Sequence, residues 1–411
     1  MTRPRILFIS PRMPYPLNSG TKIRISHLIR GLAQVGDVDL IGYGFPLELD
    51  DLLGSLSNTP DWWSGLHSIR FLPHPPWHAT EPPLYQRRLG RRFFSRTGLI
   101  YSTFPGAPLS RHAAPLAARA DLVWTERLYT ALGLRHFADK TIVDLDDLES
   151  VKTAREAESN SLAYMRWSMK REAARLARME RAAIEQFSRV AVCSAEDARF
   201  FGKASDQVWV VPNGVDDELM LKPALPRDSH RLVFVGTMNY GPNEDAMLYF
   251  CREIFPRILA QIPDATLSIV GLKPLASILA LQDDQNIFVH ANVPEVAPYV
   301  QGAAVSIVPL RVGGGTRLKI LESLALGTPV VSTTVGAEGL AFNHNEHLLL
   351  ADSPADFAEA VVRMLLDFEL NRRLAIQGRD RVKQLYLWST IRNRVATQCE
   401  NMLRSKTRNA A

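Results

Sequence analysis

The feature that most constrains the fold is an alternation of short apolar runs and helical patterns along the chain. Helical patterns include residues 20–36 and 152–201, and the latter, without Gly or Pro, predicts one or two long helices. Such an alternation is typical of a mainly parallel sheet covered on both faces. The first-half runs that predict strands are "RILFIS" (5–10), "DVDLIGY" (37–43), "HSIRFLP" (67–73), "ADLVWTE" (120–126), "KTIVDLD" (140–146), "SRVAVCS" (188–194) and "VWVVPNG" (208–214).

The second half repeats the alternation after a polar stretch with two prolines, 221–230, which has the composition of a linker. A chain of 411 residues is too long for one ordinary core. We therefore predict two doubly wound α/β domains, 1–216 and 217–385, with ligands at the carboxyl ends of their strands. The second-half strands are expected at "RLVFVG" (231–236), "ATLSIVG" (265–271), "NIFVHA" (286–291), "AVSIVPL" (304–310) and "TPVVSTT" (328–334).

Composition places the chain among soluble globular proteins, with 46% hydrophobic and 22% charged residues. No apolar run reaches 18 residues, and the N-terminus lacks the long apolar region and cleavage site of a signal peptide. Three cysteines, Cys193, Cys251 and Cys399, are far apart and odd in number. They argue against a disulfide framework or a cysteine-based metal site, and we expect a cytoplasmic protein.

The net charge of +5 is locally concentrated in "QRRLGRRFFSR" (86–96). Basic residues with interleaved aromatics can bind an anionic membrane surface or a lipid pyrophosphate. A solvated basic face beside a core aromatic pair is an equal alternative, and we expect no nucleic-acid partner. The residues that would make peripheral contact with the membrane are Arg87, Arg88, Arg91, Arg92 and Arg96.

The densest signal is "VGGGTRLKILESLALGTPVV" (312–331), a glycine-rich loop that leads into a helix ending near Gly327. Thr316 is expected to cap this helix. Glycines before a helix N-terminus let backbone N–H groups approach a phosphate. Arg317 and Lys319 in the first turn oppose the helix dipole by ~0.3–1 kcal/mol unless an anion sits there. The stretch therefore predicts a phosphate site.

Glu322 lies one turn after Lys319 on the same face of this helix. Its carboxylate could accept hydrogen bonds from two sugar hydroxyls, as acidic residues do with ribose. The alternative is a surface helix with a Lys319–Glu322 ion pair worth ~0.2–0.5 kcal/mol. The convergence of loop, cations and carboxylate favours a ligand. Neither a P-loop nor a dinucleotide fingerprint is present.

With these motifs in order, the chain resembles the retaining glycosyltransferases of the GT-B fold, family 4. The resemblance covers nearly the whole chain, is strong after residue 190 and is thin between 45 and 120. It rests on the glycine–helix stretch and on "SPRMPYPLNSGTKIR" (10–24), "VAVCSAED" (190–197), "VPNGVD" (211–216), "FVGTMNYGPNEDAM" (234–247), "VGAEGL" (335–340) and "LYLWSTIRNRV" (385–395).

The resemblance implies two Rossmann-like domains facing a cleft, 1–216 for the acceptor and 217–385 for the nucleotide sugar, with a last helix, 386–411, packing back on the first domain. Glu322 would bind the ribose, and Arg317 and Lys319 would neutralise the diphosphate. The other donor-site residues implied are Gly20, Gly236, Thr237, Asn292, Val293, Gly313, Gly314, Gly315 and Thr316.

Two departures from the family pattern matter. Gly314 stands where relatives often carry a carboxylate that contacts the donor sugar, so sugar recognition is left open. The stretch "GTMNYGPN" (236–243) lacks the Arg and Lys that relatives often have there. Arg317 and Lys319 must then carry more of the phosphate charge, and they are our first catalytic candidates.

Acidic residues follow two first-domain strands. Glu126 stands where relatives often have a polar cleft residue and could orient the acceptor, although an ordinary polar residue at a helix start is slightly favoured. Asp144, Asp146, Asp147 and Glu149 could suggest a metal site, but aspartates before a helix are more often caps. The resemblance implies no metal and no cofactor, because the cations stabilise the leaving diphosphate.

The expected function is transfer of a sugar from a UDP- or GDP-sugar to a glycan or lipid-linked acceptor in polysaccharide or exopolysaccharide synthesis. The arginine-rich segment suggests an acceptor at the inner face of the cytoplasmic membrane. The alternatives are a nucleotide-sugar epimerase of the same fold, which needs no acceptor surface, and a non-catalytic nucleotide-sugar-binding protein, which would tolerate loss of Lys319.

Overall fold

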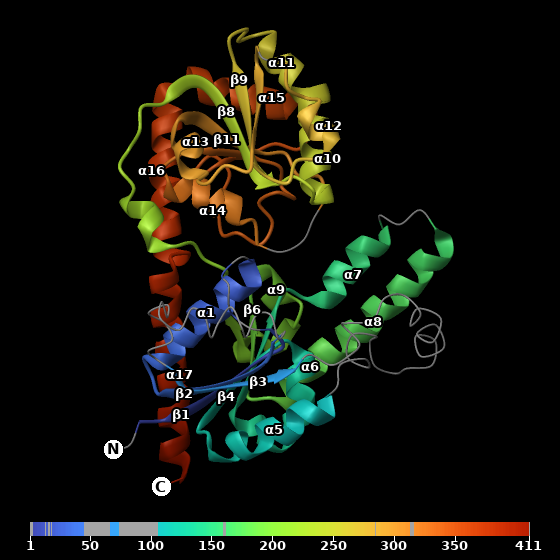
Figure 1. The fold of residues 1–411 in the computed structure, drawn as a ribbon, viewed down its shortest axis with the longest axis vertical. Coiled ribbons are helices and arrows are strands. Elements are labelled where there is room, and N and C mark those ends of the chain that lie inside the picture. The colour runs from blue at the N-terminus through green and yellow to red at the C-terminus, as the bar shows by residue number, and fades with distance from the viewer. Residues whose placement is uncertain are drawn as a thin grey trace. The chain divides into compact units, whose positions relative to one another are not determined.

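The computed structural model describes residues 3–12, 14, 17, 19–44, 66–73, 106–158, 162–283, 285–312 and 316–410. The chain forms two compact units, Met1–Pro212 together with Ile391–Ala411, and Asn213–Thr390 (Figure 1). Each unit is built on its own parallel sheet with helices around it. The prediction of two Rossmann-like α/β domains is confirmed.

The first unit contains a seven-stranded sheet in the order β3-β2-β1-β4-β5-β6-β7. Every neighbouring pair in it is parallel. The strand order reverses direction beside β1, so the loops after β1 and β4 lie at the topological switch point where such sheets bind ligands. The strands are β1 (Arg5–Ser10), β2 (Asp37–Gly44), β3 (Leu66–Pro73), β4 (Leu122–Glu126), β5 (Thr141–Asp146), β6 (Arg189–Val192) and β7 (Val208–Val210).

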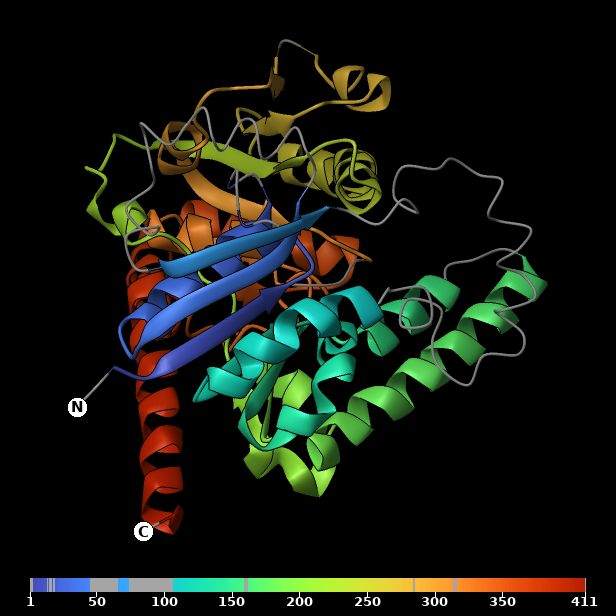
Figure 2. The ribbon, with the colours of Figure 1, turned by 60° about the horizontal axis from the view of Figure 1, so that its bottom comes forward.

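Helices of the first unit pack on this sheet and beyond it. The pair α7 and α8 forms an antiparallel hairpin that extends away from the sheet (Figures 1 and 2). The described helices are α1 (Gly20–Ala33), α5 (Gly106–Arg119), α6 (Leu128–Ala131), the 3-10 helix η4 (Leu132–Lys140), α7 (Glu149–Glu158), α8 (Ala163–Gln186), α9 (Ala195–Arg199) and the 3-10 helix η5 (Gly202–Gln207).

The C-terminal helix α17 (Trp388–Ala410) begins in the second unit, and its residues from Ile391 onward belong to the first. It packs against α1: Arg392 Nη1 donates to His27 Nδ1 at 3.0 Å. A Cβ on Gly31 would lie 3.2 Å from the Arg392 carbonyl oxygen, so the two helices approach closely.

The second unit contains a six-stranded parallel sheet in the order β10-β9-β8-β11-β12-β13. Its strands are β8 (Asp228–Thr237), β9 (Thr266–Leu272), β10 (Ile287–Ala291), β11 (Ala303–Val308), β12 (Val330–Ser332) and β13 (Leu349–Leu350). Its helices are η6 (Asp217–Leu221), α10 (Gly241–Tyr249), η7 (Phe250–Ile254), α11 (Phe255–Leu259), α12 (Ala276–Leu279), α13 (Ala297–Gln301), α14 (Leu318–Ala325), α15 (Pro354–Leu366) and α16 (Phe368–Leu385).

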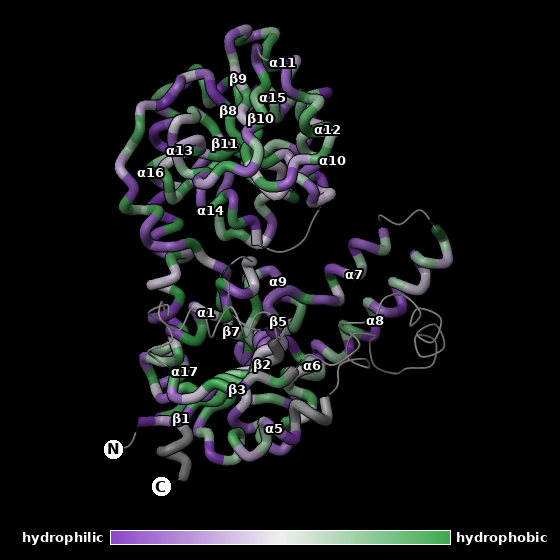
Figure 3. The backbone as a smooth tube through the Cα atoms, in the orientation of Figure 1, coloured by the Kyte–Doolittle hydropathy of each residue, from purple (hydrophilic) through white to green (hydrophobic). Residues whose placement is uncertain are grey.

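Alternating side chains of the strands enter two different cores, one on each face of the sheet. On β8, Leu232 and Phe234 join one buried cluster with α11 and α15, whereas Val233 joins the cluster on the other face, with α13. Because both faces are covered, the strands are apolar on both sides, and Figure 3 shows them mostly in the hydrophobic colour. No helix in the described part of the chain is long and apolar enough to span a bilayer.

The predicted strands all appear, most of them within two or three residues of the expected bounds. The short strand β13 was not predicted, because two residues give no periodic signal. The expected linker 221–230 is shorter, since β8 already begins at Asp228. The segment 152–201, without Gly or Pro, contains most of α7 and all of α8, followed by the strand β6 and the short helix α9.

A buried ion pair joins α1 to β5 within the first unit. Arg24, which is fully buried, donates from Nε and Nη2 to both carboxylate oxygens of Asp144, at 3.1 and 2.9 Å. Its Nη1 also donates to the Val211 carbonyl oxygen at 2.8 Å. The interpretation of Asp144 as a helix cap is therefore wrong, because this carboxylate is the counter-ion of a buried guanidinium.

We predict that Arg24→Met destabilises the protein by ~3–5 kcal/mol, since it leaves the Asp144 carboxylate buried and unpaired. The matched control is Arg3→Met, which removes the exposed Arg3–Asp37 pair and should change stability by less than ~1 kcal/mol. Guanidinium unfolding followed by tryptophan fluorescence measures both. Equal small losses for the two variants would contradict the importance of the buried pair.

Candidate functional site

A partly buried lysine lies at the carboxyl end of β8. Lys319, on α14, donates from Nζ to Asn243 Oδ1 at 2.8 Å, and the same Nζ lies 4.0 Å from the centroid of the Phe234 ring. Asn243, buried on α10, donates in turn from Nδ2 to the Thr237 carbonyl oxygen at 2.9 Å. The ammonium is thus held by an amide and a ring face, and no carboxylate neutralises it directly.

Two glycines make room for this arrangement. A Cβ on Gly236 would lie 2.7 Å from Asn243 Nδ2 and 3.2 Å from Lys319 Nζ. Its neighbour across the sheet, Gly271, would place a Cβ 1.7 Å from the Gly236 carbonyl oxygen. A side chain at either position would displace the backbone or the lysine. The two glycines therefore allow the Lys319 ammonium to lie close to the backbone at the ends of β8 and β9.

Three charges of α14 influence one another without closing a direct ion pair. Burial and the nearby Arg317 lower the pKa of Lys319 to about 7, and Glu322 opposes that shift. Burial raises the pKa of Glu322, while Lys319 lowers it and Asp216 raises it further. No Lys319–Glu322 salt bridge forms between these two described side chains, so the expected alternative of a simple surface pair is wrong. The Lys319 ammonium is thus influenced by the Glu322 carboxylate without forming an ion pair with it.

Arg317 occupies the N-cap position of α14 and is 7% exposed. Its Nη2 donates to the Val335 carbonyl oxygen at 3.4 Å. The prediction that Thr316 caps the helix is wrong: α14 begins at Leu318, and Thr316 Oγ1 instead accepts from Asn213 Nδ2 at 3.2 Å. The glycines of the loop, Gly313, Gly314 and Gly315, lie outside the described residues.

The remaining predicted donor-site residues surround the strand ends of the second unit. Thr237 is the exposed last residue of β8. Asn292 has a left-handed φ of 54°, donates its N–H to Gly271 O at 2.7 Å and accepts from the Lys273 N–H at 2.9 Å. Val293, next to it, is partly buried beside the α13 core. Asn292 and Val293 therefore lie beside the Gly236–Gly271 pair.

In the first unit, Glu126 ends β4 and is 1% exposed. Ser10 Oγ, at the end of β1, donates to Glu126 Oε2 at 2.9 Å. Burial raises the pKa of Glu126 to about 7, and the adjacent Arg127 guanidinium opposes the shift. The interpretation as an ordinary polar residue at a helix start is wrong, because Glu126 is a buried strand residue at the switch point of the sheet.

A polar network surrounds Glu126 at these strand ends. Arg127 Nη2 donates to Asp146 Oδ2 at 3.1 Å, and its Nη1 to Glu149 Oε1 at 3.2 Å. Both Arg127 and Asp146 have left-handed backbones, with φ of 69° and 58°. Cys193 Sγ donates to Asp146 Oδ1 at 2.8 Å. The cap interpretation is thus wrong for Asp146 as well, because its carboxylate accepts from the Arg127 guanidinium and from the Cys193 thiol.

The acidic cluster raised as a metal candidate is only partly assembled. Asp146, Asp147 and Cys193 have ligand atoms within 4.8 Å of one another, whereas Asp144 is held by Arg24. Burial raises the pKa of the Cys193 thiol well above its usual value, and burial next to Asp146 raises the pKa of Asp147 to about 6. The Cys193 thiol therefore stays protonated at neutral pH, and a protonated thiol is a poor metal ligand, whereas Asp147 is mostly ionised there.

Gly20 is the exposed first residue of α1, after the N-cap Ser19, whose side chain accepts from the Lys22 N–H at 3.5 Å. The arginine-rich stretch expected to meet a membrane, Arg87 to Arg96, lies outside the described residues.

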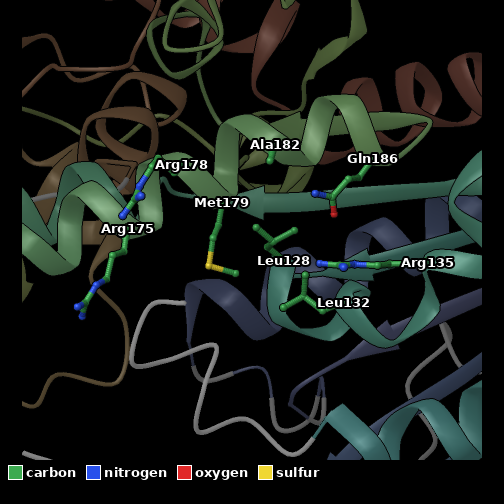
Figure 4. Close-up of a pocket in the computed structure, with 8 residues that line it drawn as sticks. All are labelled: Leu128, Leu132, Arg135, Arg175, Arg178, Met179, Ala182 and Gln186. Carbon is green, nitrogen blue, oxygen red and sulfur yellow. The ribbon is translucent and has the colours of Figure 1, made fainter. Parts of the chain in front are cut away.

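The first unit also contains a pocket of about 160 Å³ that sequence reasoning missed (Figure 4). It lies between α8 and the α6–η4 segment, with Leu128, Leu132 and Met179 on its apolar side. Its polar lining includes Arg135, Arg175 and Arg178. None of the predicted site residues lines it. The sequence offered no signal, because its lining comes from segments about 40 residues apart.

Comparison with known proteins places the candidate donor site in a recognised domain. Residues 229–367 match the family model described as "Glycosyl transferases group 1". Among curated relatives, the D-inositol 3-phosphate glycosyltransferase of Thermomonospora curvata is 28% identical over 220 residues, 46% of this chain and 51% of that protein. The chain spans about half the length of the curated relatives it matches.

Solved structures show the same fold over nearly the whole chain. Sucrose-phosphate synthase from Thermosynechococcus elongatus matches 98% of this chain and 100% of its own, with a TM-score of 0.65 and 19% identity. The Anabaena protein HepE in complex with UDP matches 97% of this chain and 100% of its own, with a TM-score of 0.64 and 14% identity. The fold is therefore GT-B, with two Rossmann-like domains.

If the Lys319 site is a diphosphate site, we predict that its affinity for a diphosphate, measured with UDP as the probe, falls as the pH rises from 7.5 to 9. The pKa of Lys319 is about 7, and a diphosphate beside it would raise that pKa, so binding above pH 7 would have to take up a proton. The loss approaches ~10-fold per pH unit in that range. Titration calorimetry measures it. Lys319→Arg is the control, since a guanidinium stays charged and the pH dependence should disappear; a pH-independent wild type would contradict the assignment.

We predict that Glu126→Gln gains stability relative to the wild type as the pH rises from 5 to 8. The folded pKa of about 7 lies above the ordinary value, so the wild type is most stable with the carboxyl protonated and loses that stability as the pH rises through 7. Glutamine does not ionise. Unfolding free energies across this range test it, with the exposed Glu196→Gln as a control that should show no such trend.

Proposed function

We propose that this chain is a glycosyltransferase that moves a sugar from a nucleoside-diphosphate sugar to a glycan or lipid-linked acceptor. One observation carries the proposal: the Lys319 ammonium, held by Asn243 beside the bare backbone of Gly236, lies within residues that match the group 1 glycosyltransferase model. A cation close to a glycine backbone at a parallel strand end suits a phosphate group.

In the proposed reaction, a hydroxyl oxygen of the acceptor forms a bond to the anomeric carbon of the sugar. The bond from that carbon to the phosphate oxygen breaks, and negative charge develops on the leaving diphosphate. Lys319 and Arg317 stabilise this charge, together with backbone N–H groups of the 313–315 loop and of Gly236 and Thr237. The leaving phosphate takes the acceptor proton, configuration is retained, and no metal or cofactor is required.

The nucleoside half of the donor is assigned to the part of α14 one turn after Lys319. Glu322 accepts hydrogen bonds from the ribose hydroxyls, and backbone around Asn292 and Val293 contacts the base. Uridine is the first candidate base, because the HepE structure of the same fold holds UDP. A guanosine donor is the alternative. The Lys319 ammonium lowers the pKa of Glu322 against the effect of burial, and so favours the charged carboxylate that accepts hydrogen bonds from hydroxyls.

The acceptor is assigned to the first unit, at the carboxyl ends of β1 and β4. Gly20 begins the helix that follows β1, and its lack of a side chain would let this loop approach the phosphate and sugar of the donor. Glu126, with a pKa of about 7, orients the acceptor hydroxyl and can exchange a proton near neutral pH. We place the activity in exopolysaccharide assembly in the cytoplasm.

The donor assignment predicts which nucleotides stabilise the protein. In a thermal-shift panel of UDP, GDP, ADP and their sugars, UDP or GDP compounds should raise the melting temperature and ADP compounds should not. Absence of stabilisation by every compound would overturn the proposal.

The ribose assignment predicts that Glu322→Ala weakens UDP binding by ~10–100-fold, the loss expected for hydrogen bonds to a charged group. The same substitution should leave the affinity for 2′,3′-dideoxy-UDP unchanged, because that nucleotide lacks the hydroxyls. Titration calorimetry compares the four combinations, with the exposed Glu346→Ala as control. An equal loss for both nucleotides would assign Glu322 a purely structural role.

A further inference from the structure

The distal end of the α7–α8 hairpin exposes large apolar side chains within one short stretch. Leu162, Tyr164 and Trp167 are 59%, 53% and 47% exposed. They belong to the residue before α8 and to its first two turns. Figures 1 and 2 show this end of the hairpin pointing away from the sheet of its own unit. Apolar rings kept at the tip of a projecting hairpin suit contact with another surface.

The exposed rings form one face of α8 together with a cation. Tyr164 and Trp167 have ring centroids 6.3 Å apart, and the Arg171 guanidinium lies 4.7 Å from the Trp167 ring. The spacing of three and then four residues keeps all three side chains on the same side of the helix. Tyrosine and tryptophan are the side chains that prefer the boundary between lipid headgroups and water.

The charge of this stretch is positive. Between residues 162 and 171 the chain has Arg166, Lys170 and Arg171 and no carboxylate. The first carboxylate of α8, Glu172, pairs with Arg175 at 3.7 Å. The last turns of α7 carry Arg155 and two exposed carboxylates, at positions 156 and 158, so the tip as a whole keeps a smaller positive excess. The exposed Leu366 and Phe368 differ, because Asp367 and Glu369 lie beside them.

The basic face continues along α8 toward the base of the hairpin. Arg175 and Arg178 follow Arg171 at four and seven residues, which places them on the same side of the helix. Both line the pocket beside Leu128 and Leu132 (Figure 4). Arg175 is 8% exposed and pairs with Glu172, whereas Arg178 is exposed. A helix with aromatic residues at one end and exposed arginines, here Arg171 and Arg178, along the same side can place rings among headgroups and guanidinium groups at phosphates.

We propose that the distal end of the α7–α8 hairpin docks onto the headgroup layer of a bilayer rich in anionic phospholipid. Leu162, Tyr164 and Trp167 enter the headgroup layer, and the exposed Lys170 and Arg171 contact lipid phosphates. Charge complementarity selects a lipid surface of negative charge over a neutral one. Such docking would hold a lipid-linked acceptor near the first unit.

The test is flotation of the full chain with vesicles of phosphatidylcholine alone or with roughly a third phosphatidylglycerol. The wild type should float with the anionic vesicles only. Lys170→Gln/Arg171→Gln should lower the partition coefficient by roughly tenfold or more. The matched control, Arg252→Gln/Arg372→Gln, removes two exposed cations of the second unit and should bind as the wild type does.

Apolar substitutions test the ring contribution. Trp167→Ala should reduce vesicle binding, and Phe368→Ala, at a more exposed ring, should not. Equal binding to neutral and anionic vesicles, no binding at all, or unchanged binding of the Lys170/Arg171 variant would each overturn the proposal. So would a dimer that Trp167→Ala dissociates, since the tip would then be a contact between copies. UDP binding is measured on every variant, so a failed vesicle result stays separate from a failed donor assignment.

Discussion

Complete coverage of two parallel sheets is the constraint on which the other features of this molecule depend. Helices occupy both faces of the second sheet, and alternate residues such as Phe234 and Val233 enter separate cores. Polar chemistry therefore has room only where strands end. Gly236, Glu126 and Asp144 each lie at or within two residues of such an end. The architecture therefore limits the candidate site to the strand ends, whichever side chains are present.

The two units use these strand ends with opposite electrostatic results. In the first unit, carboxylates of β4 and β5 meet the guanidinium groups of Arg24 and Arg127, and the network is internally paired. In the second unit, the partners of Lys319 among the described residues are an amide and a ring. A paired network suits positioning and proton exchange, whereas an ammonium without a carboxylate partner suits a bound anion. This contrast supports assigning the donor to the second unit.

Strand positions could be predicted from the sequence because a buried parallel strand is a continuous apolar run. The side-chain partners could not, since Arg24 and Asp144 are 120 residues apart and Asn243 and Lys319 are 76 apart. Local patterns carry no information about such pairs. The prediction of a cap at Thr316 was wrong for a related reason. Asn213, 103 residues away, donates to the Thr316 hydroxyl, and the helix begins two residues later, at Leu318.

Asn243 belongs to the stretch "GTMNYGPN", which lacks the cations that relatives often have there. The Asn243 amide accepts from the Lys319 ammonium and donates to the Thr237 carbonyl oxygen of β8. Lys319 is thereby held at the strand end where relatives often have additional cations. With a pKa of about 7, this lysine is only partly charged near neutral pH. Under the proposed function, a diphosphate bound there would raise that pKa. The full desolvation cost of a buried cation would then arise only when an anion is present to offset it.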